Sequence, residues 1–295
     1  MMITVKKLSE CSLNDALTAW NLGFEDYYVK INFTIDQFVG RMAMEDLSPN
    51  LSVVAFDDDK PIGIIKSGIR VMDGKKVAWN GGTAVVKAYR KKGVAKQLMH
   101  HLLALYKDEQ VSLATLEAIK ENKMAIALYQ GFGYMKKDEL ANFSLNGSQK
   151  VQMNASWGTN YTIESVLPQE VGKLSFYKEL NPWQTHWKSV PNAEAILARD
   201  AYSNDVVGYA YFRRTYDDSF NHKRTVLYQC EADPNHADQE SITKLLLTGI
   251  FGDFSNRIDR VVVNVPRKGS TTTYKMLEEI GFEITVKQVF MVNDM

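Results

Sequence analysis

Two segments of the chain contain residues whose types and spacing could do chemistry. The first, residues 85–95, reads VVKAYRKKGVA: a strand ends, a basic loop with one glycine turns, and an amphipathic helix begins. The N–H groups at a helix start carry the positive end of the helix dipole, so this geometry favours phosphate binding. Gly93 lets the backbone approach an anion closely, and Arg90, Lys91 and Lys92 add positive charge. The same residues would also suit a solvated turn between a strand and a helix.

The second segment, residues 116–134, reads LEAIKENKMAIALYQGFGY. Asn122 stands where a helix N-cap is expected, and Gly133 suits the left-handed residue that ends a helix. Ala125 and Tyr129 are four residues apart and therefore share one helix face. Read by itself, Tyr129 fits a half-buried packing role as well as a chemical one.

Hydrophobic spacing and turn residues predict the elements that must position these segments. Ser12 and Thr34 each open a capping box and so predict two helices near the start of the chain. A hairpin of two strands comes next, at 51–56 and 62–69, followed by a strand at 77–86. Helices and strands then alternate over the ranges 93–106, 111–119, 122–130 and 134–145. This order predicts an α/β (α+β) domain with a mixed, mostly antiparallel sheet flanked by helices.

The second half of the chain repeats this order. Aligning Gly133 with Gly281 gives an offset of 148 residues. At this offset the apolar stripe of the helix at 93–106 falls on a second apolar stripe, formed by Leu246, Ile250 and Phe251. An internal duplication is the simplest explanation. The polar, glycine-punctuated stretch 146–159 is the predicted boundary, so we expect domains at 1–148 and 156–295, each with the same kind of sheet.

Taken together, the two segments resemble the GNAT superfamily of acyl-CoA-dependent N-acetyltransferases. The pattern Arg-x-x-Gly-x-Ala after a strand, followed by Asn-x-x-Ala-x-x-Leu-Tyr-x-x-x-Gly-aromatic, has the spacing of the family's two motifs. The resemblance covers about residues 1–145. The family's second motif glycine is Ala95 here, which is also a small residue. The resemblance implies that acetyl-CoA is the co-substrate.

The resemblance also implies which residues contact coenzyme A. The loop after the strand would grip the pyrophosphate with Arg90, Lys91, Lys92, Gly93, Val94, Ala95 and Lys96. The last residues of the strand would hydrogen-bond the pantetheine through their backbone groups, at Ala84, Val85 and Val86. Asn122 and Tyr129 would lie beside the acyl thioester.

Acetyl transfer to an amine needs a base for the ammonium and an acid for the leaving thiolate. Glu117 lies twelve residues before Tyr129. That spacing looks like the branch of the superfamily that acetylates the N-terminal amine of a ribosomal protein, where the matching Glu is the base and the matching Tyr the acid. A carboxylate inside an apolar strand is costly unless it works or is paired. The alternative is that Glu117 forms a structural pair with a nearby lysine.

The acceptor side has weaker candidates. Phe24, Tyr27 and Tyr28 lie in the segment between the first two helices, which covers the acceptor pocket in this superfamily. Aromatic and acidic residues there would suit a cationic amine, although the aromatics could equally be core. Asn80 is a further polar candidate, next to a glycine pair where the strand could bulge to admit a ligand.

The second half lacks the residues of the first site. At the offset of 148, the basic loop falls on residues 238–243, which read DQESIT, and Tyr129 falls on Leu277. Acidic side chains there would repel a phosphate. We therefore expect a degenerate GNAT-like domain that supports or completes the acceptor pocket.

Composition narrows the class of protein further. The chain has 295 residues, with 35 basic and 35 acidic side chains, which argues against a general nucleic-acid binder. The two cysteines, Cys11 and Cys230, cannot form a disulfide framework, and no spacing indicates a metal site. The first residues lack the apolar run of a signal peptide and no stretch is long enough for a membrane span. We expect a cytoplasmic protein with no membrane or nucleic-acid partner.

These observations predict an N-acetyltransferase that moves the acetyl group of acetyl-CoA to a primary amine by direct attack in a ternary complex, with the N-terminal domain active. The alternative is a non-catalytic acyl-CoA-binding or regulatory protein. A third possibility is transfer of an amino acid or a longer acyl group by the pair of domains. The acceptor, whether a small molecule or a peptide, and the oligomeric state stay open.

Overall fold

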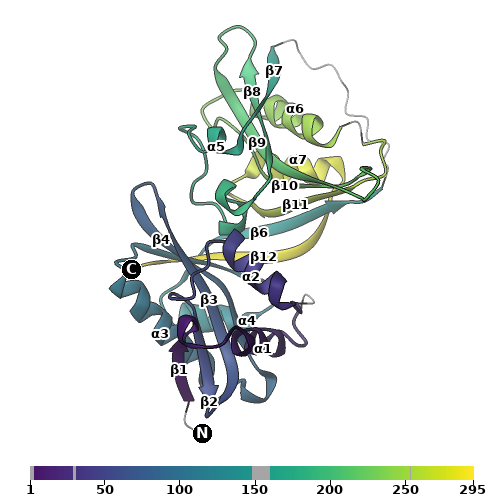
Figure 1. Ribbon diagram of the computed structural model, residues 1–295. Helices are drawn as coiled ribbons and strands as arrows, with labels where there is room; N and C mark the ends of the chain where they lie inside the picture. The colour runs from purple at the N-terminus through teal and green to yellow at the C-terminus, as the bar shows by residue number, and fades with distance from the viewer. Residues whose placement is uncertain (1–2, 29–30, 148–159, 253) are drawn as a thin grey trace. The chain divides into compact units, whose positions relative to one another are not determined.

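The computed structural model describes residues 3–28, 31–147, 160–252 and 254–295 (Figure 1). The chain forms two compact units. Unit 1 comprises Met1–Lys137 together with Val289–Met295, and unit 2 comprises Asp138–Gln288. The units thus differ from the expected segments 1–148 and 156–295, because residues 138–148 belong to unit 2 and the last residues of the chain to unit 1. Most of the expected boundary, residues 148–159, lies outside the described residues.

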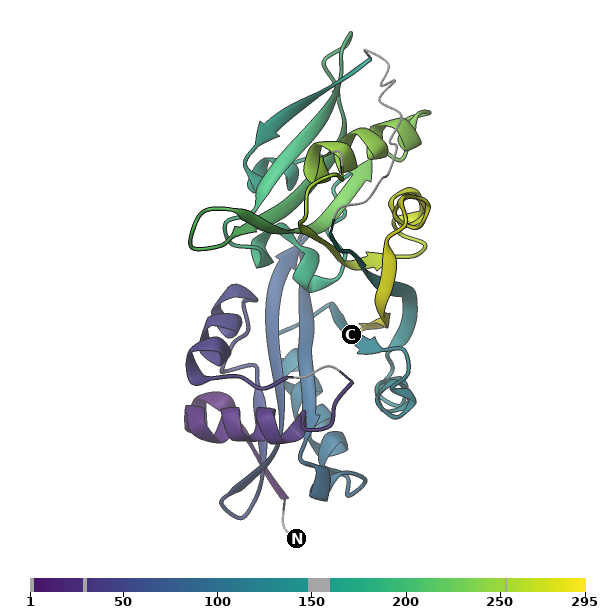
Figure 2. The ribbon, with the colours of Figure 1, turned by 90° about the vertical axis from the view of Figure 1, so that its right-hand side faces the viewer.

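Unit 1 is built on a mixed, mostly antiparallel sheet. Its strand order is β1-β2-β3-β4-β5-β12, and the strands span Ile3–Lys7, Val53–Asp57, Lys60–Met72, Lys75–Val85, Leu113–Ile119 and Glu283–Asp294. The last strand enters this unit with its final residues, where Met291 is fully buried in the core. In Figure 2, α1 (Leu13–Gly23) and α2 (Ile35–Met44) cover one face and α3 (Val94–Asp108) covers the other. The helix α4 (Lys123–Gln130) follows β5.

The helices of unit 1 begin where the sequence predicts. The Ser12 side chain accepts from the backbone N–H of Asp15, and Thr34 does the same for Gln37, so both expected capping boxes are formed. Asn122 caps α4 through a 3.1 Å hydrogen bond from the Ala125 N–H. Each of these caps satisfies an N–H group that would otherwise lack a partner in the first turn.

The sheet of unit 1 opens between β4 and β5. These two strands pair in parallel from Val77 with Leu113 to Asn80 with Leu116, and their pairing stops there although both strands continue. The opening begins beside a bulge in β4, where Gly81 is the extra residue between the partners of Lys66 and Ser67 on β3. The expected bulge is therefore present.

Glycine is required at the bulge. Gly82 has a φ of 145°, and a Cβ atom on it would lie 2.6 Å from the ring of Trp20. Any other residue would clash with that ring and strain the backbone. The bulge thus depends on the glycine pair that the sequence shows at this point.

Unit 2 has the same kind of sheet. Its strand order is β6-β11-β10-β9-β8-β7, and the strands span Met135–Leu145, Asp259–Pro266, His222–Ala232, Val206–Tyr216, Glu194–Asp200 and Tyr161–Val166. Its helices are α5 (Pro168–Val171), α6 (Gln239–Phe251) and α7 (Thr271–Ile280). The parallel pair of β10 with β11 stops at Leu227 and Val262, as the pair in unit 1 stops at Asn80 and Leu116. The predicted fold class is confirmed, and so is the repetition of the order of elements.

A buried lysine lies under the helices of unit 1. Lys66 on β3 is 0% exposed, and its Nζ lies 3.7 Å from the ring centroid of Trp20 and 4.9 Å from that of Phe38. Burial, assisted by the charge of Arg41 and opposed by Glu45, lowers the pKa of Lys66 to about 7. The aromatic faces attract the ammonium, but they do not replace the hydrogen bonds that it makes in water.

We predict that Lys66→Met increases the free energy of unfolding, and more so at pH 6 than at pH 9.5. Between the folded pKa near 7 and the ordinary value of 10.5 the unfolded chain binds more protons, so the parent's stability rises with pH across this window. Methionine removes both the cost of burying the ammonium and the pH dependence. We expect the free energy of unfolding to rise by roughly 1–4 kcal/mol at pH 6. Urea unfolding at the two pH values measures the effect. A difference that is the same at both pH values would contradict this account.

Candidate active site

The basic loop of unit 1 leads from β4 into α3. Gly93 is the N-cap of α3, with a φ of 86° and free space around its Cβ position. The first N–H groups of the helix have no carbonyl partner within the helix, and Lys91, Lys92 and Lys96 are exposed beside them. An anion at this helix start would meet backbone donors, a positive dipole end and exposed cationic side chains.

Arg90 differs from the three lysines of this loop. Its Nε donates to the carbonyl oxygen of Val85 at 3.0 Å. Its Nη2 donates to the carbonyl oxygens of Gly23 at 3.0 Å and Glu25 at 3.2 Å. The guanidinium therefore joins the loop to the segment that follows α1, a role that the spacing of the motif does not reveal.

The end of β4 has one paired edge and one open edge. Thr83, Ala84 and Val85 pair with β3 through Ile65, Ile64 and Gly63. The other edge of these residues is where β5 no longer pairs. Backbone N–H and C=O groups on an open strand edge can bind an extended amide chain in the manner of an added strand. Val86 is half-buried just beyond this edge.

Tyr129 lies on α4, buried in the core beneath α3, and its phenol hydrogen-bonds with Thr83 of β4. Burial raises the pKa of Tyr129 to about 12, against the effect of that hydrogen bond. The phenol is therefore protonated at neutral pH. Asn122 hydrogen-bonds with Tyr27, which also lies near Tyr129. The structure thus brings Thr83, Tyr129, Asn122 and Tyr27 together at the opening.

Glu117 is the first residue of β5 beyond the last pair with β4. Its neighbours Leu116 and Ala118 belong to the core under α3, so the alternation of a strand directs Glu117 to the opposite face, where α1 and α2 lie. Its Oε2 accepts a 2.7 Å hydrogen bond from the indole Nε1 of Trp79 on β4. The carboxylate and the Tyr129 phenol therefore approach the opening from opposite faces of the sheet.

The aromatic candidates for the acceptor side divide into core and surface. Phe24 is buried, with its ring centroid 4.6 Å from that of Trp20 and 4.9 Å from that of Tyr27. Tyr28 is 59% exposed and packs edge-on against Tyr27. The cluster thus runs from the core to the surface, and its outer members are the ones that a ligand can reach.

Asn80 supports the bulge of β4. It is buried, its Nδ2 donates to Thr83 Oγ1 at 3.0 Å, and its Oδ1 accepts from the N–H of Gly82 at 3.1 Å. Sequence reasoning did not assign Thr83 or Trp79 a role. Strand alternation with the correct register would have placed Trp79 on the face of Glu117.

Neither a metal cluster nor a membrane helix is found in the part of the chain that the structure describes. No group of three or more His, Cys, Asp or Glu side chains there could hold a metal ion. No helix among the same residues is both long and apolar enough to cross a membrane.

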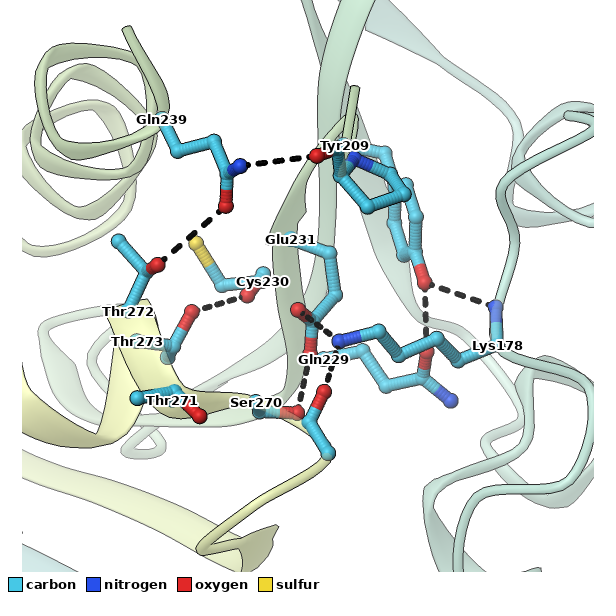
Figure 3. A network of polar contacts seen from close by, with 12 residues as sticks. Lys178, Tyr209, Gln229, Cys230, Glu231, Gln239, Ser270, Thr271, Thr272 and Thr273 are labelled. Carbon is cyan, nitrogen blue, oxygen red and sulfur yellow. Dashed lines mark hydrogen bonds and ion pairs between the residues drawn. The ribbon is translucent and has the colours of Figure 1, made fainter. Parts of the chain in front are cut away.

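The matching position in unit 2 holds an ion pair whose carboxylate is buried and whose lysine is partly exposed (Figure 3). At the offset of 148 residues, Glu231 stands in place of Thr83, and Ser270, the N-cap of α7, in place of Asn122. Lys178 Nζ and Ser270 Oγ donate to the two carboxylate oxygens of Glu231. Burial raises the pKa of Glu231, and the ammonium of Lys178 opposes that rise.

The helix start in unit 2 is acidic. Asp238 is the N-cap of α6 and Glu240 lies in its first turn. A phosphate there would meet two carboxylates where the loop of unit 1 presents lysines. The side chain at the place of Tyr129 is Leu277, which is fully buried in the apolar core.

Comparisons with known proteins identify the family to which this chain is similar. Residues 16–134 match the model of the acetyltransferase (GNAT) family. N-alpha-acetyltransferase MAK3 of Arabidopsis thaliana is 32% identical over 104 residues, which are 34% of this chain and 53% of that protein. N-alpha-acetyltransferase 30 of Schizosaccharomyces pombe is 30% identical over 101 residues, 34% of this chain and 67% of that protein. The chain thus spans about half the length of the Arabidopsis relative.

Solved structures resemble almost the whole chain. A GCN5-related N-acetyltransferase from Sphaerobacter thermophilus aligns over 99% of this chain and 95% of its own, with a TM-score of 0.66 and 13% identity. A tandem GNAT protein from the clavulanic acid biosynthesis pathway aligns over 99% and 98%, with a TM-score of 0.61 and 12% identity. These likenesses show the fold, and the match to the family model lies within unit 1. The chain belongs to the GNAT family of acetyltransferases.

Proposed function

We propose that the chain is an N-acetyltransferase that transfers the acetyl group of acetyl-CoA to a primary amine, and that unit 1 is the active half. The observation that carries this proposal is the opening between β4 and β5, flanked by the basic start of α3 and reached by Tyr129 and Glu117 from opposite faces. A donor in the opening would thus be accessible to an acceptor from the side of α1 and α2.

The donor would lie along the open edge of β4. The pantetheine amides would pair with the backbone of Ala84, Val85 and Val86, and the pyrophosphate would sit at the start of α3. The site fits this ligand, because β5 no longer pairs with this edge of β4 beyond Asn80 and the helix start combines Gly93 with exposed lysines. Asn122 is held by its capping bond and by Tyr27, so it would define the end of the opening.

The reaction would be a direct displacement. The amine nitrogen forms a bond to the acetyl carbon, the carbon–sulfur bond breaks, and the proton of the amine leaves to a base. Glu117 would take that proton, directly or through water, from the side of α1 and α2. Tyr129 would donate to the sulfur as the thiolate leaves, since its phenol carries a proton at neutral pH.

The acceptor would be an amine at a chain start or on a small molecule. Both curated relatives are named N-alpha-acetyltransferases, which favours an α-amine for this chain as well. The pKa of an α-amine is only about 7.7–8, so a weak base suffices near neutral pH. The exposed ring of Tyr28 would offer a contact for a cationic or apolar acceptor.

Unit 2 would not bind a donor. Glu231, which lies on β10 beyond its last pairing with β11, forms an ion pair with Lys178, and the helix start is acidic. We propose that it serves as a degenerate GNAT-like domain that supports the active one.

We predict one acetyl-CoA per chain and release of its thiol in the presence of an amine panel. The double change of Gly93→Asp with Lys92→Glu should weaken binding by at least about 100-fold, because two negative charges replace a close backbone approach and a cation. The matched change in unit 2, Glu240→Lys, should leave the affinity unaltered. Titration calorimetry and a thiol assay measure both. Two equivalent sites would contradict the assignment, and binding without thiol release would favour the non-catalytic alternative.

We predict that Tyr129→Phe lowers kcat by roughly 10- to 1000-fold and leaves the affinity for coenzyme A nearly unaltered, since the phenol acts only as the thiolate leaves. Tyr134→Phe is the matched control, because this second buried phenol packs beside Tyr129 in the same core. Steady-state kinetics of both variants decide the point. An undiminished kcat for Tyr129→Phe would make Tyr129 a packing residue.

We predict that Glu117→Gln removes the carboxylate limb of the pH–rate profile on the acid side, because a general base must be deprotonated to act. Trp79→Phe keeps the carboxylate and removes only its indole donor, so it should retain the limb with a smaller loss of rate. Profiles of kcat/KM with one fixed acceptor separate the enzyme's limb from that of the amine. If Glu117→Gln keeps both rate and profile, the base is water or another group.

A further inference from the structure

Arg90 connects two segments that lie far apart in the sequence. Its Nη2 donates to the carbonyl oxygens of Gly23 and Glu25, and its Nε donates to that of Val85. Gly23 and Glu25 belong to the segment 23–28, which begins at the end of α1. Val85 is the last residue of β4. One guanidinium thus holds this segment, the end of β4 and its own loop together.

The end of α1 also packs directly on β4. A Cβ atom on Gly23 would lie 2.6 Å from the Cβ atom of Ala84, so only glycine permits this contact. Lys87 adds an ion pair with Asp26 at 2.7 Å, but both side chains are more than half exposed, and such pairs contribute little. Arg90, in contrast, bonds to the backbone carbonyl oxygens of Gly23 and Glu25 themselves, so it holds the main chain of this segment and not only a side chain.

The segment continues to the other side of the opening. Tyr27 follows Asp26 directly and hydrogen-bonds with Asn122 at the start of α4. Residues 23–27 therefore touch the end of β4, the basic loop and α4, which are the three elements that surround the proposed donor site. Phe24 fixes the same segment to the core through Trp20.

We propose that Arg90 is a positioning residue that fixes the segment 23–28 of the acceptor side onto the donor loop, so that binding of coenzyme A to the loop orders this segment. The inference rests on the proposed function of unit 1. Arg90 acts here through its guanidinium bonds to carbonyl oxygens and not as a further cation for the pyrophosphate. Coupling of this kind is reciprocal, so a bound acceptor would also favour the loop conformation that binds the donor.

Two single substitutions distinguish a residue that holds the segment 23–28 by hydrogen bonds from one that only attracts the pyrophosphate by its charge. Arg90→Lys keeps the positive charge but loses the planar guanidinium, whose Nε reaches the carbonyl oxygen of Val85 while its Nη2 reaches those of Gly23 and Glu25. Lys92→Ala removes one charge from the same loop and leaves the bonds of Arg90 intact. If Arg90 only attracted phosphate, Arg90→Lys would keep both the affinity for coenzyme A and the protection of residues 23–28, because the charge is retained.

Hydrogen exchange of the full chain, with coenzyme A as the probe, is the test. In the parent, coenzyme A should slow the exchange of amides 23–28. In Arg90→Lys, affinity for coenzyme A should stay within about threefold of the parent, while these amides exchange roughly tenfold faster and gain no protection from coenzyme A. In Lys92→Ala the affinity should fall and the protection at saturating coenzyme A should persist.

Kinetics with peptides that carry a free N-terminus give a second readout. Arg90→Lys should raise the KM of the peptide by roughly tenfold and leave the KM of acetyl-CoA within about threefold. The link is disproved if Arg90→Lys retains the protection of 23–28, or if its loss is matched by an equal loss of coenzyme A affinity. A parent that binds no coenzyme A would instead overturn the proposed function, and the exchange of 23–28 in the free variants would still decide whether Arg90 holds the segment.

Discussion

The parallel pairing of β4 with β5 stops at Asn80 and Leu116, and the arrangement of the site depends on this point. A parallel pair requires a crossover, which α3 supplies here. The helix therefore starts where β4 ends, so its positive end and the lysines of its loop lie beside the open edge of the strand. The bulge at Gly81, supported by Asn80, directs the strand away from its neighbour.

The same opening separates two chemical roles. Side chains alternate along β5, so Glu117 faces α1 and α2, whereas Tyr129 comes from the core under α3. A base on the acceptor side and an acid on the donor side suit a transfer that passes through the plane of the sheet. Thr83 and Trp79, both on β4, each hydrogen-bond one of these two residues. One strand thus orients both candidate groups.

Local patterns in the sequence predict much of this architecture, because caps, turns and periodicity act within a few residues. The capping boxes, the bulge and the repeat in unit 2 are of this kind. Longer-range features leave no such signal. Periodicity does not tell which sheet a strand joins, so the assignment of residues 138–148 to unit 2 and 289–295 to unit 1 could not be predicted. The bonds of Arg90 end on backbone carbonyl oxygens, whose positions no side-chain pattern encodes.

Unit 2 has the same order of strands as unit 1, but different side chains at the positions that match the candidate site. Lys178 and Ser270 satisfy Glu231 at the place where unit 1 has Thr83, and Leu277 replaces the phenol. Unit 2 thus keeps the strand order of unit 1 with different side chains at these positions, which is consistent with a shared fold serving different purposes.

A crystal structure of the full chain with coenzyme A tests the central claim most directly. The account predicts that the pantetheine pairs with the backbone of Ala84, Val85 and Val86 on the open edge of β4, and that the pyrophosphate lies on the N–H groups at the start of α3. Coenzyme A bound at the opening between β10 and β11, or away from both openings, would contradict it.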